Sequence, residues 1–518
     1  LSMSRSESRS KEFCGFFGGT ISTDSAAQAL QRLRRGNDGT RIVCHASSGI
    51  VFGFMRHAVI APTDQSSMQP IASEDTGTLL VMNGEIFEYE DLRKKLFAQG
   101  VRLRSSGDAE TLLYRYRIEG DQFCNDIDSM FSVALYDESR GYPRIVLARD
   151  WVGELPLHYI YDQDTRTCIF GSEIKAFLEL NDYSIKDIKS LEPGTIIEVN
   201  MIDFSYRQWR YVAPFQETFS QKLSPEEIGV ELRTLLEGAA KKRILSDVPL
   251  CCLLSGGIDS TVTSYLISSL AKTAGKKVPL YTFHVAEEPI SEETDLYHAR
   301  RVARFLGLEE HLVEVCVSQE EIVSALPEVL YALEDTRNKD FNLYPAFANF
   351  FLARAIHRDG IKVAFSGEGS DELHGSYASW GSFSVAPDEI IQNKFRKKLV
   401  SNLHKGVLAR TSKVMMYAGP VEMRTLFLSR AVAGYILSLT PQCLRSGTVW
   451  KMPLVWAFQD VIPFEYLSRP KARPQDATGI MAVKDLIEKR YRKYGISEKC
   501  IREKIFDLLF VSKEMTFS

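Results

Sequence analysis

The sequence predicts an α/β protein in two domains: an N-terminal α+β domain of stacked sheets, and a C-terminal α/β domain with a parallel sheet and a helical tail. Short apolar runs and few helices fill residues 14–212, whereas strands alternate with long helices after residue 225. A chain of 518 residues is also too long for one ordinary core. We therefore expect domains at 14–212 and 225–518.

The elements of the first domain follow from their hydrophobic patterns. An amphipathic helix is predicted to begin at residue 88 and to stop at Gly100. The turn sequence ESRGYP predicts that the two strands beside it pair as a hairpin. The predicted strands lie at 49–55, 78–87, 129–137, 144–150 and 194–212.

The second domain follows a polar linker at 213–227. Its predicted strands and helices alternate, which is typical of a parallel sheet, and the tail after about residue 385 is predicted to be mostly helical. The predicted strands lie at 248–254 and 278–285 and in IKVAFSGEGSDE, and the predicted helices at 261–275 and 294–307.

Composition and charge exclude several classes of protein. A hydrophobic content of 45% and a charged content of 25% are typical of a globular protein. The net charge of −4 gives no reason to expect nucleic acid or an anionic membrane as a partner. No apolar run has the roughly 18 residues of a membrane-spanning helix. The nine cysteines contain no CxxC pair, so we expect a cytoplasmic protein without a disulfide framework or zinc site.

The sequence LLSGGIDSTV predicts a phosphate-binding loop. A buried strand runs into Ser255, Gly256, Gly257, Asp259 and Ser260, and a helix follows. Glycines let the backbone approach phosphates, the helix N-terminus offers free N–H groups, and the serines add hydroxyl donors. Asp259 can hold a magnesium ion that bridges phosphates. The alternative is a tight turn in which Asp259 only caps the helix. No Gly-Lys-Ser/Thr follows, so this is not a Walker loop.

A second loop, FSGEGSDELHGSY, follows another strand of the same sheet and carries Glu368, Asp371 and Glu372. Ligands bind at the carboxyl ends of strands in open parallel sheets, so the two loops together predict a metal–phosphate site. We expect Asp371 to be the second magnesium ligand. Glu368 is expected to face the reacting carboxylate or the incoming amine, as an orienting group or base. The alternative is a solvated acidic loop.

SGGIDS and SGEGSDE resemble the pyrophosphatase loops of the asparagine synthetase family. Weaker similarity follows in order along nearly the whole chain, for example in FGSEIKAFL and SRPKARPQDATGI. The resemblance implies an ATP-pyrophosphatase domain that uses ATP and Mg²⁺ to adenylate a carboxylate, releases pyrophosphate and lets an amine attack. It implies that Lys471 neutralises the leaving pyrophosphate and that Asp295 lies near the nucleotide. Otherwise Lys471 is a surface lysine and Asp295 a helix N-terminal charge.

The first domain resembles a class II glutamine amidotransferase of the N-terminal-nucleophile type. In that family a cysteine thiolate attacks the amide of glutamine, and the free α-amine of the same cysteine acts as base. Cys14 matches the nucleophile but is preceded by thirteen residues, and its amide nitrogen cannot act as a base. Either residues 1–13 are removed or the glutaminase is silent. Taken alone, Cys14 is a small buried hydrophobe.

The resemblance also implies the rest of a glutamine pocket. Arg56 is expected to bind the glutamine α-carboxylate, Asn83 and Gly84 to form the oxyanion hole, and Asp108 to bind the α-amine. Glu85 follows them as it does in the family. Each residue alone has a structural alternative, because Asn-Gly is a common hairpin turn and a lone Asp beside Gly and Ser is commonly a turn residue.

The sequence departs from asparagine synthetases near the acidic loop. Their Thr- and Arg-containing aspartate-contacting segment is LEDTRNKDFNLYPAFANFF here, and LFLS stands where they have PFLD. We therefore expect an AMP-forming amidoligase of specialised metabolism that joins ammonia from glutamine, or another amine, to an acid other than aspartate. Asparagine synthesis, β-lactam-type ring closure and an inactive regulatory homologue are the alternatives. The expected partners are small molecules, and a homodimer is left open.

Overall fold

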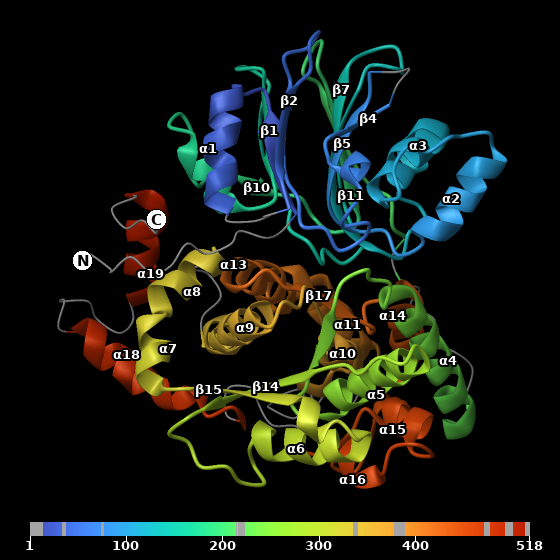
Figure 1. The fold of residues 1–518 in the computed structure, drawn as a ribbon, viewed down its shortest axis with the longest axis vertical. Helices are drawn as coiled ribbons and strands as arrows, with labels where there is room; N and C mark the ends of the chain where they lie inside the picture. The colour runs from blue at the N-terminus through green and yellow to red at the C-terminus, as the bar shows by residue number, and fades with distance from the viewer. Residues whose placement is uncertain are drawn as a thin grey trace.

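The computed structural model describes residues 14–33, 38–73, 77–213, 215, 223–334, 340–377, 389–470, 477–492 and 501–512. Figure 1 shows that the chain forms a sheet-rich N-terminal part and an α/β C-terminal part, one packed above the other. Within these described residues, no helix is both long and apolar enough to cross a membrane.

Two six-stranded sheets face each other in the N-terminal part (Figure 1). Their strand orders are β10-β8-β9-β1-β3-β2 and β12-β11-β7-β6-β5-β4. The predicted hairpin across ESRGYP is confirmed, because β6 and β7 pair antiparallel. The strands are β1 (Gly15–Gly19), β2 (Thr40–Cys44), β3 (Val51–Met55), β4 (Ile71–Ala72), β5 (Leu79–Glu85), β6 (Met130–Asp137), β7 (Arg144–Arg149), β8 (His158–Asp162), β9 (Thr167–Gly171), β10 (Lys189–Ser190), β11 (Thr195–Asn200) and β12 (Tyr206–Arg210).

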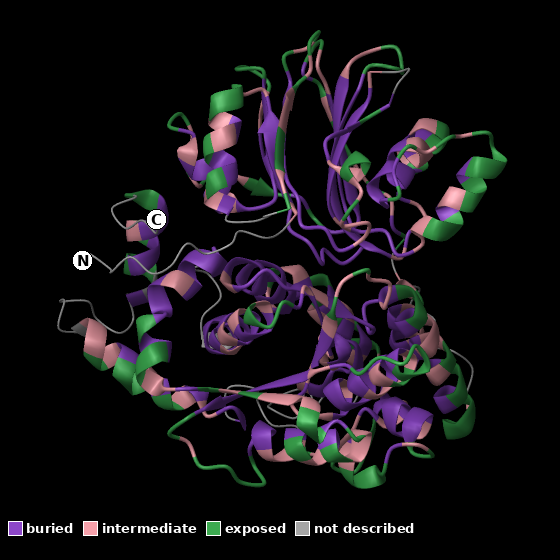
Figure 2. Cartoon of the chain, in the orientation of Figure 1, coloured by how far each residue is buried: buried purple, intermediate pink, exposed green. Residues whose placement is uncertain are grey.

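Apolar side chains from both sheets fill the space between them, and helices cover the outer faces. Phe16, Phe52, Phe54 and Leu79 belong to the buried cluster between the sheets, where each side chain contributes about 1.5–3 kcal/mol through burial. Figure 2 shows the strands as mostly buried and the outward helix faces as exposed. The helices are α1 (Thr23–Leu33), α2 (Tyr89–Ala98) and α3 (Ala109–Glu119), with the short 3₁₀ helices η1 (Gln65–Ser67), η2 (Gly120–Gln122) and η3 (Ile174–Glu179).

The C-terminal part is built on a parallel sheet, as the alternating pattern predicts. The structure gives its strand order as β15-β14-β13-β16-β17. The sequence pattern does not predict β17, because three of its four residues are polar; Glu422 and Arg424 are buried there as an ion pair at 2.7 Å. The strands are β13 (Leu250–Leu253), β14 (Leu280–Val285), β15 (Leu312–Val317), β16 (Val363–Ser366) and β17 (Glu422–Thr425), with a separate hairpin of β18 (Arg445–Ser446) and β19 (Val449–Trp450).

Helices surround the parallel sheet and form most of the tail (Figure 1). They are α4 (Pro225–Arg243), α5 (Ile258–Thr273), α6 (Asp295–Leu306), α7 (Gln319–Ser324), α8 (Leu326–Leu333), α9 (Asp340–Arg358), α10 (Ser370–His374), α11 (Glu389–Ser401), α12 (Val407–Ala409), α13 (Met416–Ala418), α14 (Arg430–Ser438), α15 (Met452–Phe458), α16 (Phe464–Leu467), α18 (Val483–Arg492) and α19 (Ile501–Phe506). Short 3₁₀ helices are η4 (Glu309–His311), η7 (Leu403–Lys405), η9 (Pro441–Leu444) and η10 (Ile480–Ala482), and the π-helices are η8 (Arg410–Met415) and η12 (Asp507–Val511).

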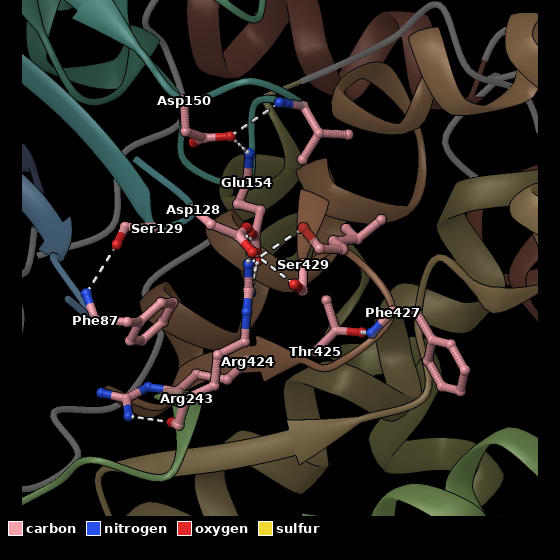
Figure 3. A network of polar contacts seen from close by, with 12 residues as sticks. Phe87, Asp128, Ser129, Asp150, Glu154, Arg243, Arg424, Thr425, Phe427 and Ser429 are labelled. Carbon is pink, nitrogen blue, oxygen red and sulfur yellow. Dashed lines mark hydrogen bonds and ion pairs between the residues drawn. The ribbon is translucent and has the colours of Figure 1, made fainter. Parts of the chain in front are cut away.

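A buried polar network joins the two parts (Figure 3). Arg243 of α4 donates to Glu154 at 3.0 Å and lies 3.6 Å from Asp128, both of which belong to the N-terminal part. The Arg430 backbone N–H at the start of α14 also donates to Asp128, at 2.8 Å. Arg243 and Glu154 are buried, and removing one partner of a buried ion pair costs about 3–5 kcal/mol. The network therefore holds the two parts in one arrangement.

A second buried ionic cluster lies elsewhere between the two parts. Lys175 of η3 contacts Glu173 at 2.5 Å and Glu334, next to α8, at 3.2 Å. Lys413 of η8 contacts the other side of Glu334 at 3.1 Å. The Lys175 ammonium also lies over the ring of Tyr331, 5.7 Å from its centre. Each buried charge in this cluster thus has an opposite charge beside it, which burial in a low-dielectric interior requires.

Candidate active sites

The predicted phosphate loop joins β13 to α5. Gly257 precedes the first turn of α5, so the N–H groups of this turn face the loop. Ser255 and Ser260 contact each other through their hydroxyls at 3.1 Å. Gly256 has a φ of 73°, and a Cβ there would lie 2.4 Å from His298 of α6. A glycine is therefore required at this position for close packing of the loop against α6.

The two loops that the sequence singled out line one cavity of about 230 Å³ at the carboxyl ends of the parallel strands. Asp259 lies in the first turn of α5, after β13, and Asp371 in α10, after β16, yet both contact the Lys451 ammonium, which lies 2.6 Å from Asp371. Asp259 is the second residue of α5, and Gly257 holds the N-cap position instead. The alternative of Asp259 as the helix cap is therefore not supported by the geometry.

Asp259 and Asp371 fit a magnesium ion that also binds phosphates. Mg²⁺ in such sites takes one or two protein carboxylates and completes its octahedron with phosphate oxygens and water. Two carboxylates from separate loops converge here on one cation, so the donor set and its charge match that pattern. No cluster of three or more Asp, Glu, His or Cys side chains that could hold a metal by itself occurs in the described parts of the chain. The phosphates would have to supply the remaining ligands.

Three cationic residues that sequence patterns did not single out border this cavity. Lys451 lies directly before α15 with a left-handed backbone, φ 62°. Arg469 donates to the Ser255 carbonyl at 2.7 Å and pairs with Asp295 at 2.9 Å. Arg410 pairs with Glu368 at 3.1 Å. No local motif marks Lys451 or Arg410, which reach the cavity from segments far away in the sequence, whereas Arg469 lies in SRPKARPQDATGI, where the resemblance pointed to Lys471 instead. Lys471, the cation that the resemblance implied, lies outside the described residues.

The carboxylates of the β16 loop differ in their surroundings. Glu368 lines the cavity beside Arg410. Glu372 is buried and accepts a hydrogen bond from Tyr377 at 2.9 Å. Burial, together with the nearby carboxylates of Asp371 and Glu368, raises the pKa of Glu372 to about 7. Glu368, rather than Glu372, is therefore placed to meet a group that enters the cavity.

A second pocket lies in the N-terminal part and brings together five of the residues assigned to glutamine. They are Cys14, Arg56, Gly84, Glu85 and Asp108. The Asn-Gly pair is no hairpin turn, because Asn83 and Gly84 lie inside β5 and pair with Ser132 and Phe131 of β6.

At the predicted oxyanion hole, the backbone of Gly84 is closely packed and the Asn83 side chain has a donor that is unpaired in the described structure. A Cβ at Gly84 would lie 2.1 Å from the Met130 carbonyl, so the backbone there requires glycine. The Asn83 side-chain nitrogen is buried, and among the described residues it has no hydrogen-bond acceptor. Buried donors normally find a partner. Within the described part of the chain, the amide is thus an unpaired buried donor, but Asn83, unlike Gly84, is not among the residues that line the pocket.

Two buried carboxylates, Glu85 and Asp108, line the pocket, and the buried Glu422 lies near them. Asp108 precedes α3 and accepts a hydrogen bond from the Ile86 N–H at 2.8 Å. Burial, with a smaller effect of the Glu422 charge, raises the pKa of Asp108 to about 6 despite this hydrogen bond. Burial and the charges of Asp108 and Glu422 also raise the pKa of Glu85 well above its usual value. A cationic group in the pocket would restore both carboxylates to their ionised form.

The Cys14 thiol is held by His57, which sequence reasoning did not identify. The His57 N–H donates to the sulfur at 3.2 Å, and the sulfur lies 3.1 Å from the His57 carbonyl. Burial strongly raises the pKa of Cys14, and the charges of Glu85, Glu422 and Asp108 raise it further. Burial lowers the pKa of His57 to about 3, so its ring is neutral near pH 7. With neighbours of this kind, Cys14 stays a thiol until a base takes its proton.

A small cavity lies between the two sites. Glu154 and Leu155 line it from the N-terminal part, and Ser366 and Glu368 line both this cavity and the larger one. At its other end, Leu155 packs against Gly84, since a Cβ on Gly84 would lie 2.6 Å from the Leu155 side chain. Leu155 therefore contacts both this small cavity and Gly84 of the glutamine pocket, and Glu368 borders both this cavity and the larger one.

Comparisons with known proteins agree with this two-part organisation. Residues 13–192 match the family model of the glutamine amidotransferase domain, and residues 231–392 match that of asparagine synthase. The chain is 28% identical to asparagine synthetase B of Escherichia coli K12 over 92% of this chain and 84% of that protein. It is 31% identical to the asparagine synthetase of Zea mays over 87% of this chain and 74% of that protein.

Similar solved structures are more distant. The structure of the allosteric regulatory enzyme of purine biosynthesis is 14% identical with a TM-score of 0.34, and the match covers 59% of this chain and 80% of that one. Because this TM-score is low, we assign the fold from the sheets described above and not from this similarity. The similarity in sequence is much stronger: a probable asparagine synthetase of Schizosaccharomyces pombe is 30% identical over 82% of this chain and 77% of its own length. On this evidence, the chain belongs to the asparagine synthetase family.

Proposed function

We propose that residues 225–518 activate a carboxylic acid as its acyl-adenylate, and that residues 14–212 supply ammonia for its amidation by hydrolysing glutamine. The proposed adenylation is supported by one observation above all. Asp259 and Asp371, which follow two different strands, both contact Lys451 in a single cavity. A phosphate-binding loop at a helix N-terminus, two carboxylates for a magnesium ion and nearby cations are the parts that adenylation needs.

Each group has a role in the proposed reaction. The first-turn N–H groups of α5 and the hydroxyls of Ser255 and Ser260 would bind phosphate oxygens. Asp259 and Asp371 would hold Mg²⁺, which neutralises phosphate charge. Lys451, and Lys471 by family resemblance, would stabilise charge on the departing pyrophosphate. Glu368 would accept a proton from the amine that attacks the acyl carbonyl.

The acid itself is proposed to carry a second hydrogen-bond acceptor, such as a second carboxylate. Arg410 Nε and Asn349 Nδ2 are both buried donors, and neither has a hydrogen-bond acceptor among the described residues. Both residues line the large cavity. The rest of the α9 wall is apolar, formed by Pro345, Ala348 and Leu352. Buried donors that face an apolar-walled cavity favour a ligand with an acceptor at one end and apolar surface beside it.

We therefore propose an acid other than aspartate, from specialised metabolism. The apolar wall supports this proposal. The changed sequence of the segment that contacts aspartate in family members supports it as well. Part of that segment, residues 335–339, lies outside the described residues. So do residues 378–383, which follow the acidic loop in the sequence. Asparagine synthesis is the second candidate, favoured by the identity to asparagine synthetases over most of the chain.

A substrate panel tests the proposal. The chain is supplied with ATP, Mg²⁺ and ammonia, and with aspartate, longer or aromatic dicarboxylic acids, or matched monocarboxylic acids. We expect AMP and pyrophosphate only with acids that carry the second acceptor, and Arg410→Ala should raise the KM of the acid more than that of ATP. Activity with aspartate alone would establish the second candidate. Release of ADP and phosphate, or no turnover with any acid, would contradict the adenylation proposal.

Glutamine use should depend on pH through Asp108. Only the ionised carboxylate can pair with the α-ammonium of glutamine, and the raised pKa of about 6 means that ionisation increases as pH rises through 6. The KM for glutamine should therefore be about ten-fold higher at pH 5 than at pH 8. The measurement is glutamate release from pH 5 to 8 by a chain that begins at Cys14. Asp108→Asn should raise the KM and flatten this dependence, and an unchanged profile would exclude Asp108 from binding.

A further inference from the structure

The segment of residues 56–61, here called the glutamine loop, follows β3 and forms one wall of the glutamine pocket. It carries Arg56, and its residue His57 contacts Cys14. Arg56 donates to the carbonyl of Ala61 at 2.7 Å, so the far end of the loop sets the position of the guanidinium. Ala61 has a φ of 51°, a left-handed conformation that non-glycine residues rarely adopt. The loop therefore needs contacts that hold it in place.

One such contact comes from the other domain, through Asp247. The Asp247 carboxylate accepts a hydrogen bond from the Ala61 N–H at 2.8 Å, and the Asp247 N–H donates to the Val59 carbonyl at 3.2 Å. Both bonds fix the strained end of the loop. A chain of two contacts thus runs from Asp247 through Ala61 to Arg56.

The near end of the loop is held by Lys362. Its ammonium donates to Asp38 at 2.9 Å, and the same Asp38 oxygen accepts from the Ala58 N–H at 2.8 Å. Burial alone would raise the pKa of Asp38, but the hydrogen bonds from Ala58 and Lys362 outweigh it and lower the pKa. The Lys362 charge also lies close enough to His57 to help lower the pKa of its ring. Lys362 therefore supports the part of the loop that contacts Cys14.

Asp247 and Lys362 both lie just before strands of the parallel sheet. Asp247 lies three residues before β13 and Lys362 directly before β16, and these are neighbouring parallel strands. The carboxyl ends of the same two strands carry the phosphate loop and the acidic loop. The glutamine loop is thus bound to the amino ends of the two strands that carry the nucleotide-binding loops.

We propose that Asp247 and Lys362 are positioning residues of the glutamine site, supplied by the synthetase domain. They act through the backbone of residues 57–61, and they orient Arg56 for the glutamine α-carboxylate and His57 against the nucleophile. The proposal depends on the proposed glutaminase function. It implies that the glutamine pocket is complete only when the second domain is packed against the first.

The test uses the full chain from Cys14 onward. Asp247→Ala and Lys362→Met should each raise the KM for glutamine about 3- to 10-fold with a smaller change in kcat, since each removes contacts that orient a binding group. Amidation with ammonia should be unchanged. Asp247→Asn should have a KM for glutamine close to that of the parent chain, because the asparagine oxygen can still accept a hydrogen bond from the Ala61 N–H. Lys362→Arg should likewise stay close to the parent chain, because arginine can still pair with Asp38.

Matched controls come from solvent-accessible ion pairs outside the glutamine loop. Asp460→Ala, at the pair with Arg233, and Lys94→Met, at the pair with Asp91, should leave the KM for glutamine unchanged. Lys362 is proposed to act through Asp38. The double variant Asp38→Asn, Lys362→Met should therefore have a KM for glutamine no higher than that of the single variant with the higher KM. Equal KM values in the Asp247 and Lys362 variants and the parent chain would overturn the proposal.

A binding measurement separates the failure of this proposal from the failure of the glutaminase function. Calorimetry with glutamine and the Cys14→Ala form of the same chain reports binding without turnover. If the parent chain neither hydrolyses nor binds glutamine, the glutaminase function is wrong, and this proposal is overturned with it. If the parent binds glutamine and the Asp247→Ala and Lys362→Met forms bind it equally well, only the positioning proposal is wrong.

Discussion

Replacing Asp259 with Asn is expected to lower ATP-dependent amide formation about 100-fold or more, with glutamine and with ammonia as donor. The amide keeps an oxygen for the hydrogen bond that the Ser370 hydroxyl donates at 2.6 Å, so the loop should retain its fold. What it loses is the negative charge that faces Lys451 and would hold magnesium beside the phosphates. The loss should therefore appear in catalysis and not in stability.

The measurement is pyrophosphate release with the acid identified by the substrate panel, over a range of Mg²⁺ concentrations. The variant should need more Mg²⁺ than the parent chain. Asp460→Asn, which removes a charge from an exposed ion pair with Arg233, is the matched control and should be fully active. Glutamine hydrolysis by a chain that begins at Cys14 should persist in Asp259→Asn, because its pocket lies in the other domain. Unchanged pyrophosphate release in the variant would show that Asp259 has only a structural role.

A chain that begins at Cys14 is expected to hydrolyse glutamine, whereas a chain that retains residues 1–13 should be inactive with glutamine and active with ammonia. Burial and three nearby carboxylates raise the pKa of the Cys14 thiol, so it does not ionise by itself near pH 7. The α-amine of a terminal cysteine provides the base that an amide nitrogen cannot, and general bases of this kind contribute about 10²–10⁴-fold to rate.

The two chains are compared by glutamate release, with intact mass used to verify each N-terminus. Cys14→Ala in the shorter chain is the control and should remove glutaminase activity while ammonia-dependent amidation continues. Equal glutaminase rates in the two chains, with residues 1–13 present in the longer one, would disprove the N-terminal-nucleophile mechanism. If the shorter chain is also inactive, the first domain does not supply the amine.

Much of the fold was predictable because its signals are local. A buried strand that runs into glycines and then a helix specifies the loop after β13, and the same logic places the acidic loop after β16. The parallel sheet follows from the alternation of strands and helices. β17 was missed because a strand of four residues with an internal ion pair has no apolar pattern to detect.

The sequence by itself predicted candidate residues for both sites: Asp259 and Asp371 stand in glycine-rich segments after buried strands, and the family resemblance implied Cys14, Arg56 and Asp108. Only the tertiary structure decided which distant residues complete those sites. Lys451 meets the two aspartates from a segment nearly 200 residues beyond Asp259. Asp247 and Lys362 likewise reach the glutamine loop from the opposite domain. Such contacts leave no local pattern, because their geometry comes from the packing of one domain on the other.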